Sequence, residues 1–155
     1  MIMADARFED GATHPINLVA HDEDDLAVLS ALVQDAVLTA GDIRYTKSKR
    51  RLVLLINRFR WEDGSAQKPE RVRSLLVFDD VTHVQAQGVD RQDPNVVLSL
   101  LSLGFAPGDD GAGVVTLVFA GDGALALAVE ALDVALKDVT KPYLAPSRLT
   151  PKHPE

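Results

Sequence analysis

Residues 51–61 read RLVLLINRFRW, and this stretch decides the fold class. Residues 52–56 are apolar on both faces of an extended chain, which is typical of a strand inside a sheet. From there on, arginines alternate with other side chains, with Asn57, Phe59 and Trp61 on one side and Arg58 and Arg60 on the other. The stretch therefore predicts an interior strand whose last residues carry two arginines on one face.

Further strands are expected on both sides of this stretch. Ile43 and Tyr45 alternate with polar residues, and the polar run 46–50 predicts a turn that makes a hairpin with the strand at 52–61. The polar segment 62–70, with Gly and Pro, predicts a mobile loop. Strand character resumes at 72–78, bends at Asp79-Asp80 and continues toward Gly88.

The rest of the chain adds an edge strand and a second hairpin. Residues 16–20 form a short apolar stretch with poor alternation, which we interpret as an edge strand. The tight turn Gly121-Asp122-Gly123 predicts a hairpin between 114–119 and 125–129. Period-two spacing extends strand character to Val139, and a helix over 129–139 is the alternative because Ala and Leu favour helix.

Two helices are predicted, each after an aspartate cap. Asp22 precedes an apolar face of Leu26, Leu29, Leu32, Val33 and Ala36, and this helix is expected to end before Gly41. Asp93 and Pro94 fit the first positions of a second helix that ends at Gly104. Its predicted buried stripe consists of Val97, Leu98, Leu100 and Leu101.

These elements predict an α+β fold, mainly antiparallel, with about six to seven strands and two helices. Because each half places a helix before a group of strands, a duplicated α-β-β-β unit is an alternative. We expect a single domain over 1–155, with an ordered core at about 16–140 and frayed N- and C-terminal segments.

Composition narrows the class of protein. The chain has 155 residues, a formal net charge of −7 and no cysteine, so disulfides and cysteine-based zinc sites are excluded and a cytoplasmic location is expected. No apolar run reaches the roughly 18 residues that span a bilayer, so no membrane partner is predicted. The acidic balance disfavours general nucleic-acid binding.

No catalytic constellation is present. A nucleophile elbow and a phosphate-binding glycine loop are both missing. His21 beside the acids that follow it is a candidate metal group, but helix capping explains the same acids. His83 near Asp79 or Asp80 is the best acid–base candidate, although a histidine hydrogen-bonded within a sheet is the simpler interpretation. We therefore predict no catalytic residue, no metal and no cofactor.

The charge is unevenly distributed. Residues 41–74 hold ten Lys/Arg against four Asp/Glu, whereas the remaining residues hold six against nineteen. If the strands at 52–61 and 72–78 pair, their arginines converge and suit a phosphate or a carboxylate. The alternative is a solvated face whose arginines pair with nearby acids. The candidate anion- or partner-binding residues are Arg44, Arg58, Arg60, Arg71 and Arg73.

These observations assign no activity to the chain. The favoured hypothesis is a non-enzymatic binding or interaction module that uses a basic β-surface for an anionic ligand or an acidic protein. A structural homodimer or other homo-oligomer is the alternative, and an enzyme with a dispersed His/Asp/Arg site ranks below both.

Several segments together resemble a known family. They include Gln34-Asp35-Ala36-Val37-Leu38, Gly41-Asp42-Ile43, Ile56-Asn57-Arg58-Phe59 with Trp61-Glu62, and Asp93-Pro94. Over roughly 16–140 the chain resembles an uncharacterised alphaproteobacterial domain-of-unknown-function family, number twenty-nine forty-eight. The resemblance implies a single domain in a bacterial cytoplasm, and it implies no activity, cofactor or catalytic residue.

Overall fold

The computed structural model describes residues 15–61, 70–89, 92–140 and 143–144. The predicted frayed N-terminal segment, most of the predicted loop at 62–70 and most of the C-terminal tail lie outside these residues. The described elements are β1 (Asn17–Ala20), α2 (Glu23–Leu32), β2 (Ala36–Thr39), η1 (Ala40–Asp42), β3 (Ile43–Thr46), η2 (Lys47–Lys49), β4 (Arg51–Phe59), β5 (Glu70–Phe78), β6 (Val81–Gln87), β7 (Val97–Pro107), η4 (Asp109–Gly111), β8 (Gly113–Phe119), β9 (Gly123–Val129), β10 (Val134–Asp138) and β11 (Tyr143–Leu144).

All the strands belong to one antiparallel sheet. Its order is β1-β10-β5-β4-β2-β7-β8-β9-β6, with β3 also paired to β4 and β11 to β5. Strand β4 is central: one edge pairs along its length with β5, and the other edge is shared by β3 at residues 51–54 and β2 at Asn57. Strand β1 lies at the end of the order, which confirms the predicted edge strand.

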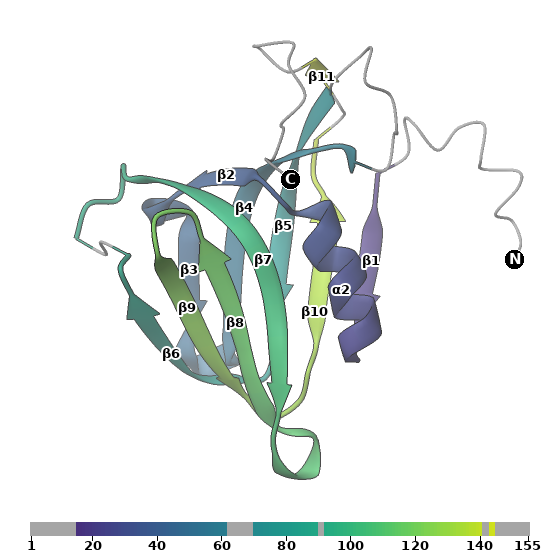
Figure 1. Ribbon diagram of the computed structural model, residues 1–155, viewed down its shortest axis with the longest axis vertical. Helices are drawn as coiled ribbons and strands as arrows, with labels where there is room; N and C mark the ends of the chain where they lie inside the picture. The colour runs from purple at the N-terminus through teal and green to yellow at the C-terminus, as the bar shows by residue number, and fades with distance from the viewer. Residues whose placement is uncertain (1–14, 62–69, 90–91, 141–142, 145–155) are drawn as a thin grey trace, which may run out of the picture.

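The sheet curls until its last strand returns to the middle of the order (Figure 1). The Tyr45 hydroxyl on β3 donates to the carbonyl oxygen of Val81 on β6 at 2.8 Å. The Val81 amide donates to the Arg50 carbonyl oxygen, also at 2.8 Å. Beyond these two hydrogen bonds, β3 and β6 are not paired with each other, so a seam remains between them.

Helix α2 covers the concave side of the sheet at β1 and β7 (Figure 1). The Asp22 side chain accepts a hydrogen bond from the Asp25 amide at 2.8 Å, as the predicted cap requires. Leu26 and Leu29 of the helix join the same buried cluster as the inward side chains of the strands. The Ser30 hydroxyl accepts from the Leu103 amide at 2.9 Å and fixes the helix on β7. No helix among the residues the structure describes is long and apolar enough to cross a membrane.

The predicted fold class is wrong in its proportions. The structure contains eleven strands in one sheet, not six to seven, and α2 is the one α-helix of the described residues, not one of two. The α+β description holds only loosely, because a single helix accompanies a large sheet. The duplicated α-β-β-β unit is also wrong, because the second half has no helix to match α2 in the described part of the chain.

The predicted second helix is the strand β7. The predicted stripe is divided between the two faces of β7: Leu98 and Leu100 are buried, whereas Val97 is 66% exposed and Leu101 is half-buried. A bulge between Leu100 and Ser102 then brings Leu103 to the inner face. Strands β2 and β8 pair with the main chain of β7 on its two edges. The Asp93 side chain caps a turn instead, accepting from the Asn95 amide at 3.0 Å.

The first helix is real but shorter than predicted. It ends at Leu32, and Asp35 then takes a positive φ of 67° that an α-helix does not allow. The next residues form β2, which fills the ladder between β4 and β7. The predicted hairpins of β3 with β4 and of β8 with β9 are confirmed, and so is strand rather than helix at β10.

Candidate functional site

Strand pairing sorts the candidate arginines onto two faces of the sheet. Along β4, Leu52, Leu54 and Ile56 are buried in the core, and Arg58 follows them on the same inner face. Residues directly opposite each other across a ladder share a face. Because Arg73 pairs with Asn57 and Arg71 pairs with Phe59, these two arginines lie on the outer face. The strands pair as expected, but Arg58 does not converge with Arg71 and Arg73.

Arg58 lies in a buried ion-pair network. Its side chain is 0% exposed and that of Asp138 is 2% exposed, with Nη2 3.0 Å from Oδ2. The Arg58 Nε donates to Ser74 Oγ at 3.1 Å, and the Ser74 hydroxyl donates to Asp138 Oδ1 at 2.6 Å. The Ile16 amide donates to Asp138 Oδ2 at 2.9 Å, so the network joins β4, β5, β10 and the residue before β1. A guanidinium held this way serves the fold and is not available to a ligand.

Arg60 is also buried. Its side chain is 1% exposed, and Nη1 lies 2.7 Å from the Glu70 carboxylate across the start of β5. The Trp61 indole next to it donates to the Gln34 carbonyl oxygen at 2.9 Å and packs edge-on against Phe59. These contacts make the segment after β4 a packed part of the molecule.

The outer face of the sheet carries the remaining three candidates and one further cation. Arg71 and Arg73 lie on β5, and Arg44 on β3 pairs with Val53 of β4. Lys137 on β10 pairs with Leu75, so it lies on the same face. We call the three neighbours Arg71, Arg73 and Lys137 the basic cluster, and Arg44 lies farther along the same face.

The basic cluster forms no ion pair with any residue that the structure describes. Within the described ranges, no carboxylate lies at ion-pair distance from its members or from Arg44. Arg71 instead donates to the carbonyl and side-chain oxygens of Asn57, at 3.3 and 3.4 Å. Arg73 and Lys137 are exposed. The cluster is therefore a set of cations open to an external anion.

Two other basic residues at the surface are paired with carboxylates. Arg50 binds Glu130. Arg51 lies 2.7 Å from the Asp79 carboxylate, and this hydrogen bond, helped by the charge of Asp79, raises the pKa of Arg51 above its ordinary value. Arg50 and Arg51 therefore add no unpaired charge to this surface, whereas Arg44 and the basic cluster have no carboxylate at ion-pair distance among the described residues.

A shallow hollow of about 170 Å³ lies next to the basic cluster. Arg73, Asn57, Thr39 and Asp42 form its polar side, and the Asp42 carboxylate accepts hydrogen bonds from the amide and the hydroxyl of Thr39. Leu55 and two exposed valines, Val37 and Val97, belong to its apolar side, with Val97 66% exposed. The outer face thus combines a cationic group with a hollow large enough for one apolar side chain.

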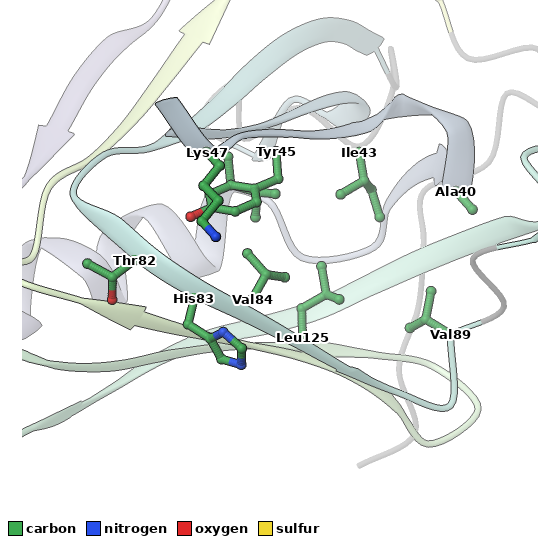
Figure 2. Close-up of a pocket in the computed structure, with 10 residues that line it drawn as sticks. Ala40, Ile43, Tyr45, Lys47, Thr82, His83, Val84, Val89 and Leu125 are labelled. Carbon is green, nitrogen blue, oxygen red and sulfur yellow. The ribbon is translucent and has the colours of Figure 1, made fainter. Parts of the chain in front are cut away.

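The histidine candidates lie elsewhere. His83 lines a separate cavity between β3 and β6 (Figure 2), whereas Asp79 is bound to Arg51. Asp80 lines an open hollow with His21, so the dispersed His/Asp/Arg site does not gather around one cavity. His21 Nε2 lies 3.3 Å from the Asp133 carboxylate, and no metal-binding group of three His, Asp or Glu occurs in the part of the chain that the structure describes.

Sequence reasoning missed Lys137 and Asp138. The period-two pattern of β10 already shows that Lys137 lies outside and Asp138 inside. The pattern does not show their partners, because Leu75 and Arg58 lie 62 and 80 residues earlier in the chain.

Comparisons with known proteins give one informative result. A family model described as "Protein of unknown function (DUF2948)" matches residues 16–153. No curated protein and no solved structure matches the chain.

Proposed function

The chain belongs to the family of proteins of unknown function DUF2948, and we propose that it is a non-enzymatic, single-domain interaction module whose outer sheet face binds an acidic protein segment. One observation carries the proposal: Arg73 and Lys137 are exposed, Arg71 is half-buried, and none of the three has a carboxylate partner among the described residues. Arg58 and Arg60 have no part in this surface, because both are buried and ion-paired.

The spacing of the basic cluster suits an extended acidic segment. Arg71 and Arg73 are two residues apart on one strand, about 7 Å between Cα atoms. Lys137 is diagonal to Arg73 across the ladder, at about 7–8 Å. Carboxylates two residues apart on an extended segment repeat at the same interval, so one segment supplies each cation with a partner. Arginine adds specificity because its guanidinium binds a carboxylate with two parallel hydrogen bonds.

The hollow beside Arg73 indicates that the partner also carries an apolar side chain. Its apolar side leaves Val37 and Val97 exposed to solvent, and an apolar side chain that fills it removes both from water. Interfaces draw most of their affinity from a few such central anchors, with polar groups around them. The partner we propose therefore carries one apolar residue flanked by carboxylates.

Long-range charge orients the encounter. Residues 41–74 carry a local excess of positive charge, and the rest of the chain is strongly acidic. An acidic segment is repelled by most of the molecule and attracted to the basic part, which raises the association rate at low salt. We place the module in a bacterial cytoplasm, the setting favoured by the absence of cysteine and implied by the family resemblance.

The test is fluorescence anisotropy with a labelled peptide that has glutamates spaced two residues apart on either side of a central leucine, so that the carboxylates and the leucine lie on one face of the extended segment. We expect salt-sensitive binding, weakened about tenfold by Arg73→Glu. Lys49→Glu is the matched control, because it makes the same charge change in η2, outside the basic cluster. A peptide with serine in place of the leucine tests the hollow, and it is expected to bind more weakly.

Three outcomes would overturn the proposal. One is the absence of peptide binding at low salt, and another is equal weakening by Arg73→Glu and Lys49→Glu. The third is a dimer of the wild-type chain, seen by sedimentation, that Arg73→Glu dissociates. That result would assign the surface to a second copy of the chain.

A further inference from the structure

A second cavity lies at the seam between β3 and β6, separate from the hollow on the outer face. Its volume is about 360 Å³, within the range of small-molecule sites. Strand β3 pairs only with β4 and β6 only with β9 among the described strands, so two unpaired sheet edges form its walls. The Tyr45–Val81 hydrogen bond closes the seam at one end.

The cavity has a polar end and an apolar end (Figure 2). Lys47 lies on one wall and His83 with Thr82 on the opposite wall, all three at the end where Tyr45 joins the two edges. Ala40, Ile43 and Val89 extend toward the other end. The buried core residues Leu52 and Leu125 also line the cavity, so it reaches the hydrophobic core.

The polar end is built by a local irregularity of β6. The register of β6 against β9 shifts between Val81 and His83. This bulge leaves Thr82 and His83 as two successive exposed residues, whereas a regular strand would send one of them inward. Bulges commonly occur beside functional sites, where they re-aim a side chain.

The charge at the polar end is uncompensated. No carboxylate lies at ion-pair distance from Lys47 anywhere in the described segments. The Tyr45 hydroxyl donates to Val81 and the Thr82 hydroxyl donates to the Ala128 carbonyl oxygen, so Lys47 is the principal donor left for a ligand at this end, with His83 on the opposite wall. An anionic group at this end pairs with the ammonium group of Lys47. An apolar chain attached to it covers Ile43 and Val84, so that less apolar surface is exposed to water.

We infer that this cavity binds a small amphipathic monocarboxylate of medium chain length, with the carboxylate at Lys47 and the hydrocarbon body between Ile43, Val84 and Leu125. The cavity's size selects against long chains, and its apolar end selects against short hydrophilic acids. The inference is independent of the acidic-segment proposal, because the two sites share none of their lining residues.

Calorimetric titration with octanoate, hexanoate and 1-octanol tests the assignment on the full chain. We expect octanoate to bind about tenfold more tightly than hexanoate, because two more methylenes are buried. Lys47→Gln is expected to weaken octanoate about tenfold and to leave 1-octanol unchanged, because only the charge interaction is lost. Lys49→Gln, in the same turn but not in the cavity lining, is the matched control.

A cavity-filling variant provides the second readout. Val84→Phe adds volume at the centre of the cavity, and we expect it to abolish binding of both octanoate and 1-octanol. Far-UV circular dichroism and Tm show whether Val84→Phe folds. If this variant does not fold, the Lys47→Gln measurement alone tests the inference. Absence of octanoate binding to the wild type, equal octanoate affinity in Lys47→Gln, or binding retained by folded Val84→Phe would each overturn the inference. Arg73→Glu must leave octanoate binding intact, which separates this test from that of the outer face.

Discussion

Arg58 and Asp138 lie opposite each other inside the sheet, 3.0 Å between Nη2 and Oδ2, at the end of a row of aliphatic core residues. One strand lies between them in the order of the sheet: Arg58 is on β4, Asp138 is on β10, and Ser74 of the intervening β5 bonds to both. Water does not reach this position, so the charge of Arg58 is stabilised by the carboxylate of Asp138.

Removal of the carboxylate leaves a buried cation. We expect Asp138→Ala to lower the free energy of unfolding by about 3–5 kcal/mol. The double variant Arg58→Met/Asp138→Leu is expected to recover much of this loss, since apolar side chains of similar size often replace a buried pair without penalty. Urea denaturation of Arg58→Met, Asp138→Leu and the double variant measures the coupling. A double variant as unstable as the sum of the single ones would contradict this account.

The basic cluster is expected to lower the stability of the free protein. Lys137→Glu replaces a repulsive neighbour of Arg73 with an attractive one, and we expect a gain of about 0.2–1 kcal/mol in the free energy of unfolding at low salt. The same variant is expected to weaken binding of the acidic peptide. Chemical denaturation at low and high salt measures the gain, which must shrink as salt screens the charges. Lys49→Glu, outside the cluster, is the control for net charge.

The hydroxyl of Tyr45 joins the two edges of the seam. Tyr45→Phe removes its hydrogen bond to the Val81 carbonyl and keeps the ring, so we expect a loss of about 1 kcal/mol in the free energy of unfolding. Hydrogen exchange is expected to accelerate at the β6 amides, because the edge is freer to open. The amides of β5, far from the seam, serve as the internal reference. Unchanged exchange in β6 would show that the hydroxyl does not restrain this edge.

The Arg51–Asp79 pair gives a pH prediction. The folded-state pKa of Arg51 is raised by its hydrogen bond to Asp79, so the stabilisation is fully present below the ordinary arginine pKa and is lost only as the pH rises through the raised value. Arg51→Gln is therefore expected to lower Tm by a small amount that stays the same between pH 7 and pH 10. Salt should reduce the difference, because the pair is exposed. A difference that disappears before pH 10 would contradict the assignment.

Sequence patterns predicted strands better than they predicted faces. The alternation after residue 56 correctly opposed Arg58 to Phe59, but residues 52–56 are apolar at every position, so nothing local showed which face was inner. The buried partner that settles it, Asp138, is 80 residues away. Of the five candidate arginines, the structure places Arg44, Arg71 and Arg73 on the outer face and removes Arg58 and Arg60 from it.

The prediction of a second helix was wrong for a different reason. The predicted stripe of Val97, Leu98, Leu100 and Leu101 is divided between the two faces of β7, and the bulge after Leu100 is visible only when the partner strand is known. The cavity at the seam was equally hidden, since Lys47 and His83 line one cavity only because β6 returns to β3. Local propensity is a weak guide wherever long-range pairing supplies the hydrogen bonds.

The pairing of Asn17 with Lys137 has a consequence for synthesis on the ribosome. The partner of β1 emerges roughly 120 residues after β1 itself, a delay on the order of ten seconds at ordinary translation rates. Until then β5 lacks the neighbour that carries Asp138, and the guanidinium of Arg58 has to remain hydrated. The nascent chain therefore forms the β1-β10-β5 part of the sheet late in synthesis. Of all the strands described, β1 remains unpaired for the longest time after it has been made.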